Sequence, residues 1–157
     1  MTPASAEELT LDPPLDFLRR LWRLSQALEK MSSRMERELG ITAQQRLVLR
    51  TVGLHPEITP GKLARTLYLD PGTISATIAR LVTKGLLTKK RDVADARRYF
   101  LRLTRTGKTL SGVSEPTVET AVLRVLERST KAELSVVRGV LERLSEELEE
   151  SARRSFP

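Results

Sequence analysis

Apolar residues recur at alternating spacings of three and four near the start of the chain, which is the pattern of an α-helix with one buried face. The pattern begins at Leu15, and Gly40 is a stop signal because glycine readily adopts the left-handed backbone that ends helices. Residues 1–14 hold three prolines and no apolar period, so we expect either a mobile arm or one that lies over a partner subunit. A second helix is predicted over residues 42–54, with an inward face of Leu47, Val48 and Val52.

Two helix-start signals follow, and each is a capping side chain with proline directly after it. Thr59-Pro60 and Asp70-Pro71 predict helices over residues 60–67 and 71–84, joined by a tight connection. Gly85 predicts a left-handed cap at the end of the longer helix, where Lys84 complements the helix dipole. Two helices joined so closely predict a helix-turn-helix.

After Gly85 the spacing of apolar residues changes. The helical repeat gives way to an apolar residue at every second position, which is typical of β-strands. Residues 87–90 and 99–103 predict two half-buried strands joined by a polar loop, so the helix-turn-helix becomes a winged helix. One more helix is predicted around residues 110–125. A last helix follows Ser129-Thr130, with a strict three-four apolar spacing in Leu134, Val137, Leu141, Leu144 and Leu148. The chain therefore predicts a mainly α fold of six helices with one small β-hairpin wing.

Positive charge is concentrated in one segment of the chain. The 157 residues carry a net charge of +7. Residues 73–108 alone hold ten cations and two anions, a net of +8, so the other 121 residues have a net charge of −1. A local excess of this kind indicates a surface for a polyanion, whereas uniform basicity is more often a solubility feature.

Composition excludes several kinds of chemistry. With no cysteine and one histidine, the sequence excludes thiol chemistry and cysteine-based zinc sites, and we expect no metal and no cofactor. An enzyme is the least favoured class, because there is no glycine-rich phosphate loop and no Ser/His/Asp set. No apolar run reaches the roughly 18–20 residues that span a bilayer. The first ten residues lack the features of a signal peptide, so the expected compartment is the cytoplasm, with no membrane partner.

Four short motifs follow one another through the predicted winged helix. They are Thr59-Pro60-Gly61-Lys62-Leu63-Ala64-Arg65, Leu69-Asp70-Pro71-Gly72-Thr73-Ile74-Ser75, Leu81-Val82-Thr83-Lys84-Gly85-Leu86-Leu87, and Asp95-Ala96-Arg97 with Leu103-Thr104-Arg105-Thr106-Gly107. Together they resemble the MarR family of bacterial transcription regulators. A lone helix-turn-helix would be a weak signal, but the wing motif at this distance from it is specific.

The resemblance implies a homodimer that binds double-stranded DNA, usually as a repressor released by a small aromatic or phenolic ligand. It places an N-terminal dimerisation helix at residues 15–40, the winged helix-turn-helix at 41–104 and C-terminal dimerisation helices at 105–157. The residues agree with this division, because the apolar stripes at both ends of the chain are too long for one such domain to cover.

The helix over residues 71–84 is expected to enter the major groove of DNA. Its predicted exposed face carries Thr73, Ala76, Thr77 and Arg80, whose short side chains allow close approach to base edges while arginine reaches guanine or phosphate. Gly72 would let the backbone approach a phosphate closely. The two threonines are also compatible with ordinary solvent-facing positions. The opposite face is predicted to pack in the core through Ile74, Ile78 and Leu81.

In the wing, Arg97 is expected to enter the minor groove, with Asp95 orienting it and the loop through a carboxylate hydrogen bond. The alternative is a surface salt bridge. Tyr99 and Phe100 are expected in the hairpin core rather than as base-stacking residues. Phosphate contacts are expected from Lys89, Lys90, Arg91 and Arg98, whereas Lys62 and Ser75 fit phosphate contacts and plain surface equally well.

Candidate ligand residues lie outside the basic segment. An aromatic side chain beside arginines suits an aromatic carboxylate, which nominates Arg19, Trp22, Arg23 and His55. Trp22 also fits a dimer core, and His55 fits an exposed loop. Two other functions remain open from the sequence: a winged helix that docks an acidic protein, and a non-specific DNA coat. Specific binding to a promoter distinguishes the leading hypothesis from both.

Overall fold

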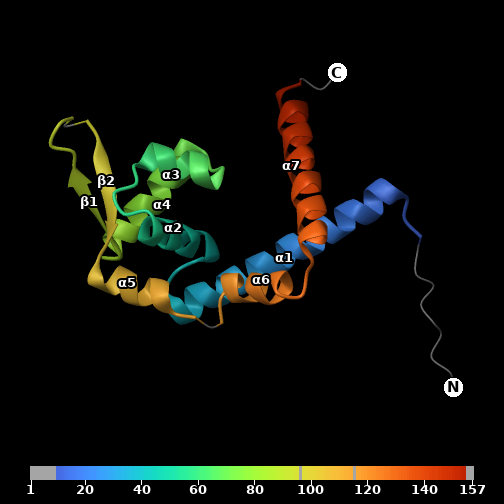
Figure 1. Ribbon diagram of the computed structural model, residues 1–157, viewed down its shortest axis with the longest axis horizontal. Helices are drawn as coiled ribbons and strands as arrows, with labels where there is room; N and C mark the ends of the chain where they lie inside the picture. The colour runs from blue at the N-terminus through green and yellow to red at the C-terminus, as the bar shows by residue number, and fades with distance from the viewer. Residues whose placement is uncertain (1–9, 96, 115, 155–157) are drawn as a thin grey trace. The chain divides into compact units, whose positions relative to one another are not determined.

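The computed structural model describes residues 10–95, 97–114 and 116–154. The chain divides into two compact units, and the boundary along the sequence lies between Thr117 and Val118. The second unit holds α6 (Val118–Leu126) and α7 (Lys131–Arg153). The first unit holds α1 (Pro13–Leu39), α2 (Ala43–Leu54), α3 (Pro60–Leu67), α4 (Pro71–Thr83), β1 (Leu87–Arg91), β2 (Tyr99–Leu103) and α5 (Arg105–Gly112) (Figure 1). The prediction of a mainly helical fold with a single small hairpin is confirmed for the described residues.

The described residues contain seven helices rather than the predicted six. The apolar stripe around residues 110–125 is divided between α5 and α6, and Pro116 lies in the interval between them. Proline inside a helix removes one backbone hydrogen bond and clashes with the carbonyl four residues earlier. The stripe therefore could not continue as one helix.

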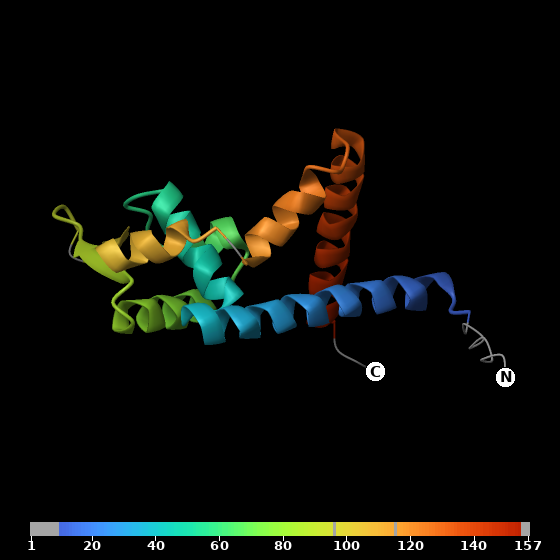
Figure 2. The same ribbon diagram turned by 90° about the horizontal axis from the view of Figure 1, so that it is seen from below.

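Helix α1 begins earlier than its apolar pattern predicts. Asp12 is the N-cap, with its carboxylate accepting from the Leu15 amide, and two prolines occupy the first helical positions. The helix therefore starts two residues before the predicted Leu15, and residues 1–9 of the predicted arm lie outside the described residues. The predicted stop at Gly40 is confirmed by its φ of 72°. Figure 2 shows α1 as one long helix, and its C-terminal turns pack against α2.

The helix-turn-helix is formed by α3, a three-residue turn and α4. Thr59 and Asp70 cap the two helices as predicted, and each side chain accepts from the amide three residues further on. Tyr68 closes α3 in the left-handed region, with φ of 52°, and its side chain is 96% exposed. Gly85 follows α4 with φ of 68°, which confirms the predicted left-handed cap.

The hairpin is antiparallel, and a single residue of the loop between α2 and α3 pairs with its second strand. Leu87 pairs with Leu103 and Lys89 with Leu101, while Ile58 forms an isolated bridge to Leu101 on the other edge of β2. The loop between α2 and α3 therefore lies beside the wing. Ile58 and Leu101 are both buried, so this contact joins the wing to the helical core.

One apolar cluster holds the winged helix together. Ile74, Ile78 and Leu81 of α4 are buried in it, as predicted. From α2 it takes Val48 and Val52, but Leu47 is 45% exposed, so the prediction that Leu47 faces inward is wrong. Other fully buried members come from the loop after α1, from α2 and α3 and from both strands; they include Ile41, Leu49, Leu63, Leu87 and Leu101.

Two cationic side chains, Arg46 and Lys84, form hydrogen bonds to distant segments of the chain, and the sequence did not predict these bonds. Arg46 is 2% exposed and its guanidinium donates to the carbonyls of Leu110 (2.7 Å), Ser111 (3.4 Å) and Val113. It thereby satisfies carbonyls at the end of α5, which have no partner within the helix. Lys84, which we expected only to complement the α4 dipole, donates to the Gly40 carbonyl (2.6 Å) and the Gln45 side chain (3.1 Å).

The junction between β2 and α5 is close-packed against the end of α4. The Thr104 hydroxyl donates to the Gly85 carbonyl (2.7 Å) and accepts from the Gly107 amide (2.9 Å), so it caps α5 and anchors it at once. The Thr104 amide donates to the Leu86 carbonyl (3.1 Å). A Cβ on Gly107 would overlap that same carbonyl oxygen, so only glycine fits there.

In the part of the chain that the structure describes, no helix is long and apolar enough to cross a membrane.

Gly107→Ala should therefore destabilise the protein, because the added methyl group has to displace the backbone at Leu86. We expect a loss of about 2 kcal/mol or more in the free energy of unfolding, measured by urea denaturation. Gly112→Ala is the matched control, since a Cβ at Gly112 meets no atom within 4 Å. Equal stability of the two variants would contradict the close packing of this junction.

Candidate nucleic-acid interface

The N-terminus of α4 is held by a network centred on one carboxylate. Asp70 accepts from the Thr73 amide (2.8 Å) and from the Thr73 hydroxyl. These hydrogen bonds lower the pKa of Asp70 below its usual value of 3.8, and the bond from the Thr73 hydroxyl has the largest effect. The Thr73 hydroxyl proton is therefore used by the cap, which leaves its oxygen lone pairs and its methyl group for any outside contact.

The exposed face of α4 differs from the predicted one at one position. Ser75, Ala76 and Arg80 are exposed, as is Gly72 at the start of the helix. Thr77, however, is only 3% exposed, so the prediction that it faces outward is wrong. Successive helical residues are about 100° apart, which places residue 77 beside Ile78 and one turn from Ile74 on the core-facing arc.

The tip of the wing is shaped by two aspartates. Asp92 accepts from the Ala94 amide (2.9 Å), and Asp95 accepts from the Arg97 amide (3.0 Å). The carboxylate hydrogen bond expected between Asp95 and Arg97 is therefore present, but at the main chain. Within the described residues, the Arg97 guanidinium forms no ion pair, and its side chain is exposed. It can therefore reach an external anion.

The other cations predicted to contact phosphate differ in whether another side chain already pairs with them. Arg91 and Arg98 are exposed and form no ion pair with any described residue. The Lys89 ammonium lies 4.9 Å from the centre of the Tyr99 ring, a cation–π contact. Lys90 lies 4.0 Å from the Glu57 carboxylate, which also pairs closely with Arg102.

A cationic hollow of about 540 Å³ lies between α3 and the start of β2. Lys62 and Arg98, both predicted, line it together with Arg65, His55 and Phe100. Sequence reasoning did not single out Arg65, although it lies three residues after Lys62 and so shares one face of α3 with it. The structure thus gathers three permanent cations from two separate segments on one side of the winged helix.

The four candidate ligand residues do not come together. Trp22 is 63% exposed on α1, and Arg19 on the same helix is paired with Asp16. Asp16 accepts hydrogen bonds from Arg19 and Arg20, and both lower its pKa; the bond from Arg19 has the larger effect. Neither Trp22, Arg19 nor Arg23 lines the hollow to which His55 belongs. The described residues hold no group of three or more side chains that could bind a metal ion.

Known proteins with similar sequences are transcriptional regulators. The MarR family model matches residues 39–98. The organic hydroperoxide resistance transcriptional regulator of Bacillus subtilis is 33% identical over 104 residues, which are 66% of this chain and 69% of that protein. An HTH-type transcriptional repressor of Mycobacterium tuberculosis is 28% identical over 133 residues, covering 85% and 94% of the two chains.

A solved structure shows the same fold. The crystal structure of Staphylococcus aureus MepR in complex with DNA matches 90% of this chain and 99% of that chain, with a TM-score of 0.69 and 21% identity.

The lowered pKa of Asp70 predicts a pH dependence of stability. Its folded pKa lies below its unfolded value of 3.8, so the stabilisation is complete well above pH 3.8 and is lost as the pH falls through the folded pKa. Asp70→Asn keeps a capping oxygen but not the charge. We expect wild type to be more stable than Asp70→Asn at neutral pH, and the difference to shrink towards pH 3 in urea denaturation. A difference that is the same at both pH values would rule out the role of the carboxylate charge.

Proposed function

The chain belongs to the MarR family of transcriptional regulators, and we propose that it acts as a homodimeric repressor on a pseudo-palindromic double-stranded operator. The observation that carries this proposal is the division of the molecule into one basic winged helix and a nearly neutral remainder. Within the winged helix, the exposed side of α4 and the free cations of the wing belong to adjoining elements. An enzyme is not supported, since the relatives are regulators.

The proposal assigns separate roles to the two elements. The exposed side of α4, with Ala76 and Arg80, would read base edges in the major groove, and the outward lone pairs of Thr73 could add to this. Thr77 is withdrawn from this set because it is buried. Arg97 at the wing tip would enter the minor groove. The phosphate contacts would come from Lys62, Gly72, Ser75, Lys89, Lys90, Arg91 and Arg98, with Asp95 shaping the wing.

The remaining helices would form the dimer. In the described residues, neither α6 nor α7 buries a single side chain, and Val125, Val137 and Leu148 are among their exposed apolar residues. On α1, Trp22 and Leu28 are exposed as well. Contiguous apolar faces of this extent mark an interface, and a second copy supplies a matching surface by symmetry. Residues 15–40 and 105–157 would then serve dimerisation, and 41–104 would bind DNA.

Release by a small aromatic or phenolic ligand completes the proposal. The winged-helix unit contains hollows of about 500 and 650 Å³, which lie within the size range of small-molecule sites. Arg19, Trp22, Arg23 and His55 stay the predicted ligand residues, and these two hollows are lined by other residues.

Arg97→Ala should weaken binding to the promoter region of the protein's own gene by about tenfold or more, because a minor-groove contact is lost. The affinity can be measured by fluorescence anisotropy, with circular dichroism showing that the fold is intact. Arg128→Ala also removes one exposed arginine, but from the segment between α6 and α7. A wild-type affinity in Arg97→Ala, or an equal loss in both variants, would refute the assignment of Arg97.

Leu141→Glu should convert a large part of the dimer to monomer at micromolar concentration, because a carboxylate on the apolar stripe of α7 would have to be buried. Sedimentation velocity measures the two species. Ser135→Glu adds the same charge to an exposed polar position of α7 and should leave the dimer intact. If Leu141→Glu sediments as the wild type does, α7 is not part of the dimer interface.

A further inference from the structure

Two described residues other than glycine hold their backbone in the left-handed region. They are Glu57, with φ of 68°, and Tyr68, with φ of 52°. A residue with a Cβ is strained there, because the Cβ lies too close to the following carbonyl oxygen. Such strain persists where contacts of the residue offset it or where the residue has a function. The contacts of each residue therefore show which explanation applies.

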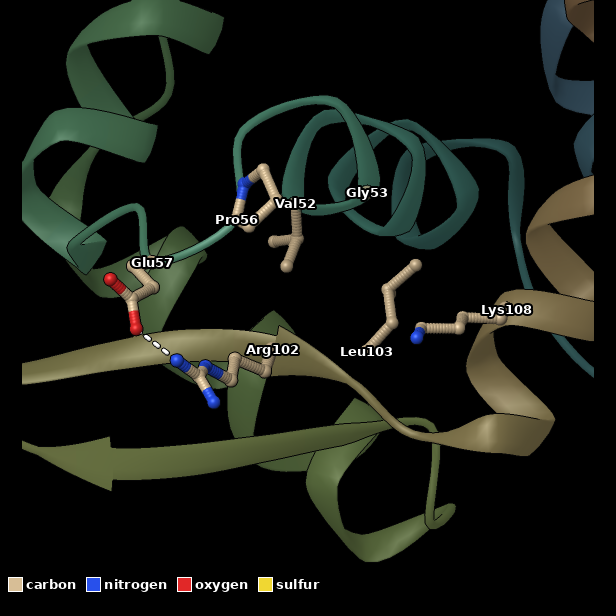
Figure 3. A pocket seen from close by; sticks show the side chains of 7 residues that line it. All are labelled: Val52, Gly53, Pro56, Glu57, Arg102, Leu103 and Lys108. Atoms are coloured by element: carbon tan, nitrogen blue, oxygen red, sulfur yellow. Dashed lines mark hydrogen bonds and ion pairs between the residues drawn. The ribbon is translucent and has the colours of Figure 1, made fainter.

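The conformation of Glu57 is offset by contacts inside the winged helix. Its carboxylate pairs closely with Arg102, as Figure 3 shows, and lies 4.0 Å from the Lys90 ammonium. Its amide donates to the Leu101 carbonyl (3.3 Å). The strained backbone thus directs Glu57 onto the second strand of the wing, so the fold itself explains this residue.

The side chain of Tyr68 makes no comparable contact. It is 96% exposed, and it forms no hydrogen bond, ion pair or ring contact with any described residue. Only its backbone acts in the fold: the Tyr68 amide donates to the Arg65 carbonyl (3.4 Å), and the Leu69 amide donates to the Ala64 carbonyl (3.1 Å). These two bonds end α3, and glycine is the usual residue at this position of such a helix end. The fold therefore does not explain the tyrosine side chain.

Tyr68 lies in the turn that leads from α3 into α4. On either side of it, Leu67 and Leu69 are partly buried against the apolar core, so the turn is held in place while the ring between them stays in solvent. Gly72, in the first turn of α4, is exposed as well. The Tyr68 ring therefore extends the exposed surface at the start of α4.

The place of this turn in a complex with DNA follows from the helix-turn-helix. In such complexes the first helix crosses the sugar-phosphate backbone, and the second helix begins in the major groove. The turn between them then lies at the edge of the groove, where the phosphates are. A phenol suits this place, because its hydroxyl donates to a phosphate oxygen while its ring lies against the deoxyribose.

We propose that the Tyr68 hydroxyl donates a hydrogen bond to a DNA phosphate at the edge of the major groove and so helps to fix the position of α4 in it. The inference rests on the proposed function, since it assigns a contact in the same complex. In a symmetric dimer the bond forms twice, once in each half-site. The strain at Tyr68 is then kept for a side chain that acts only when DNA is bound.

Tyr68→Gly should change stability and DNA affinity in opposite directions. Relief of the backbone strain should raise the Tm by about 2 °C, measured by circular dichroism. The affinity for a duplex selected from a random-sequence library should fall about tenfold or more, measured by fluorescence anisotropy, because two hydrogen bonds to phosphate are lost per dimer. A lower Tm would show that the side chain supports the fold, and would overturn the proposal.

Tyr68→Phe keeps the ring and removes the hydroxyl, and it should weaken binding about fivefold or more. The matched control is Tyr99→Phe, which removes the hydroxyl of the other tyrosine but keeps the ring that lies against Lys89, and should bind as the wild type does. Replacing single phosphates of the duplex by uncharged methylphosphonate locates the contact. At one phosphate in each half-site, this change should weaken wild-type binding several-fold more than binding by Tyr68→Phe.

The outcomes separate this contact from the proposed function. If the wild type selects a duplex but Tyr68→Phe binds it equally well, or if no phosphate distinguishes the two proteins, the contact is overturned and the proposed function stands. If the wild type selects no duplex, the proposed function fails and the contact fails with it.

Discussion

The structure depends on one constraint: one side of α4 has to be buried in the core while the opposite side stays exposed to solvent. Ile74, Ile78 and Leu81 lie in the apolar core with less than 2% of their surface exposed, and this burial fixes the rotation of the helix about its axis. The remaining face then has to point outward, with Ala76 and Arg80 on it. Because α4 has little freedom to rotate, its exposed side chains are held in a fixed array, which is what reading base edges requires.

The wing is held to the same core by contacts of a different kind. Ile58 and Leu101 join it through a buried bridge, and Glu57 pairs with Arg102 beside them. At the other end, Thr104 and Gly107 fix the start of α5 against the end of α4. Arg91, Arg97 and Arg98 form no ion pair with any described residue, so these cations near the wing tip are exposed to solvent.

Local signals predicted most of the elements, and contacts between distant residues explain what was missed. Asp70-Pro71 predicted the start of α4, yet the same signal at Asp12-Pro13 was overlooked because the apolar pattern begins only at Leu15. Thr77 was assigned to the wrong face since a threonine is equally compatible with either side of a helix. The partners of Arg46 lie more than 60 residues away and are backbone carbonyls, which leave no trace in a sequence pattern.

The central claim is that this winged helix reads a DNA sequence, and selection from a random-sequence duplex library by the purified full chain tests it most directly. We expect an inverted repeat with half-sites about 10 base pairs apart, or a multiple of that spacing, as two copies related by symmetry require. The selected duplex should bind roughly 1,000-fold more tightly than a shuffled duplex at physiological salt. A library from which no sequence is enriched, with equal affinity for all duplexes, would contradict the claim.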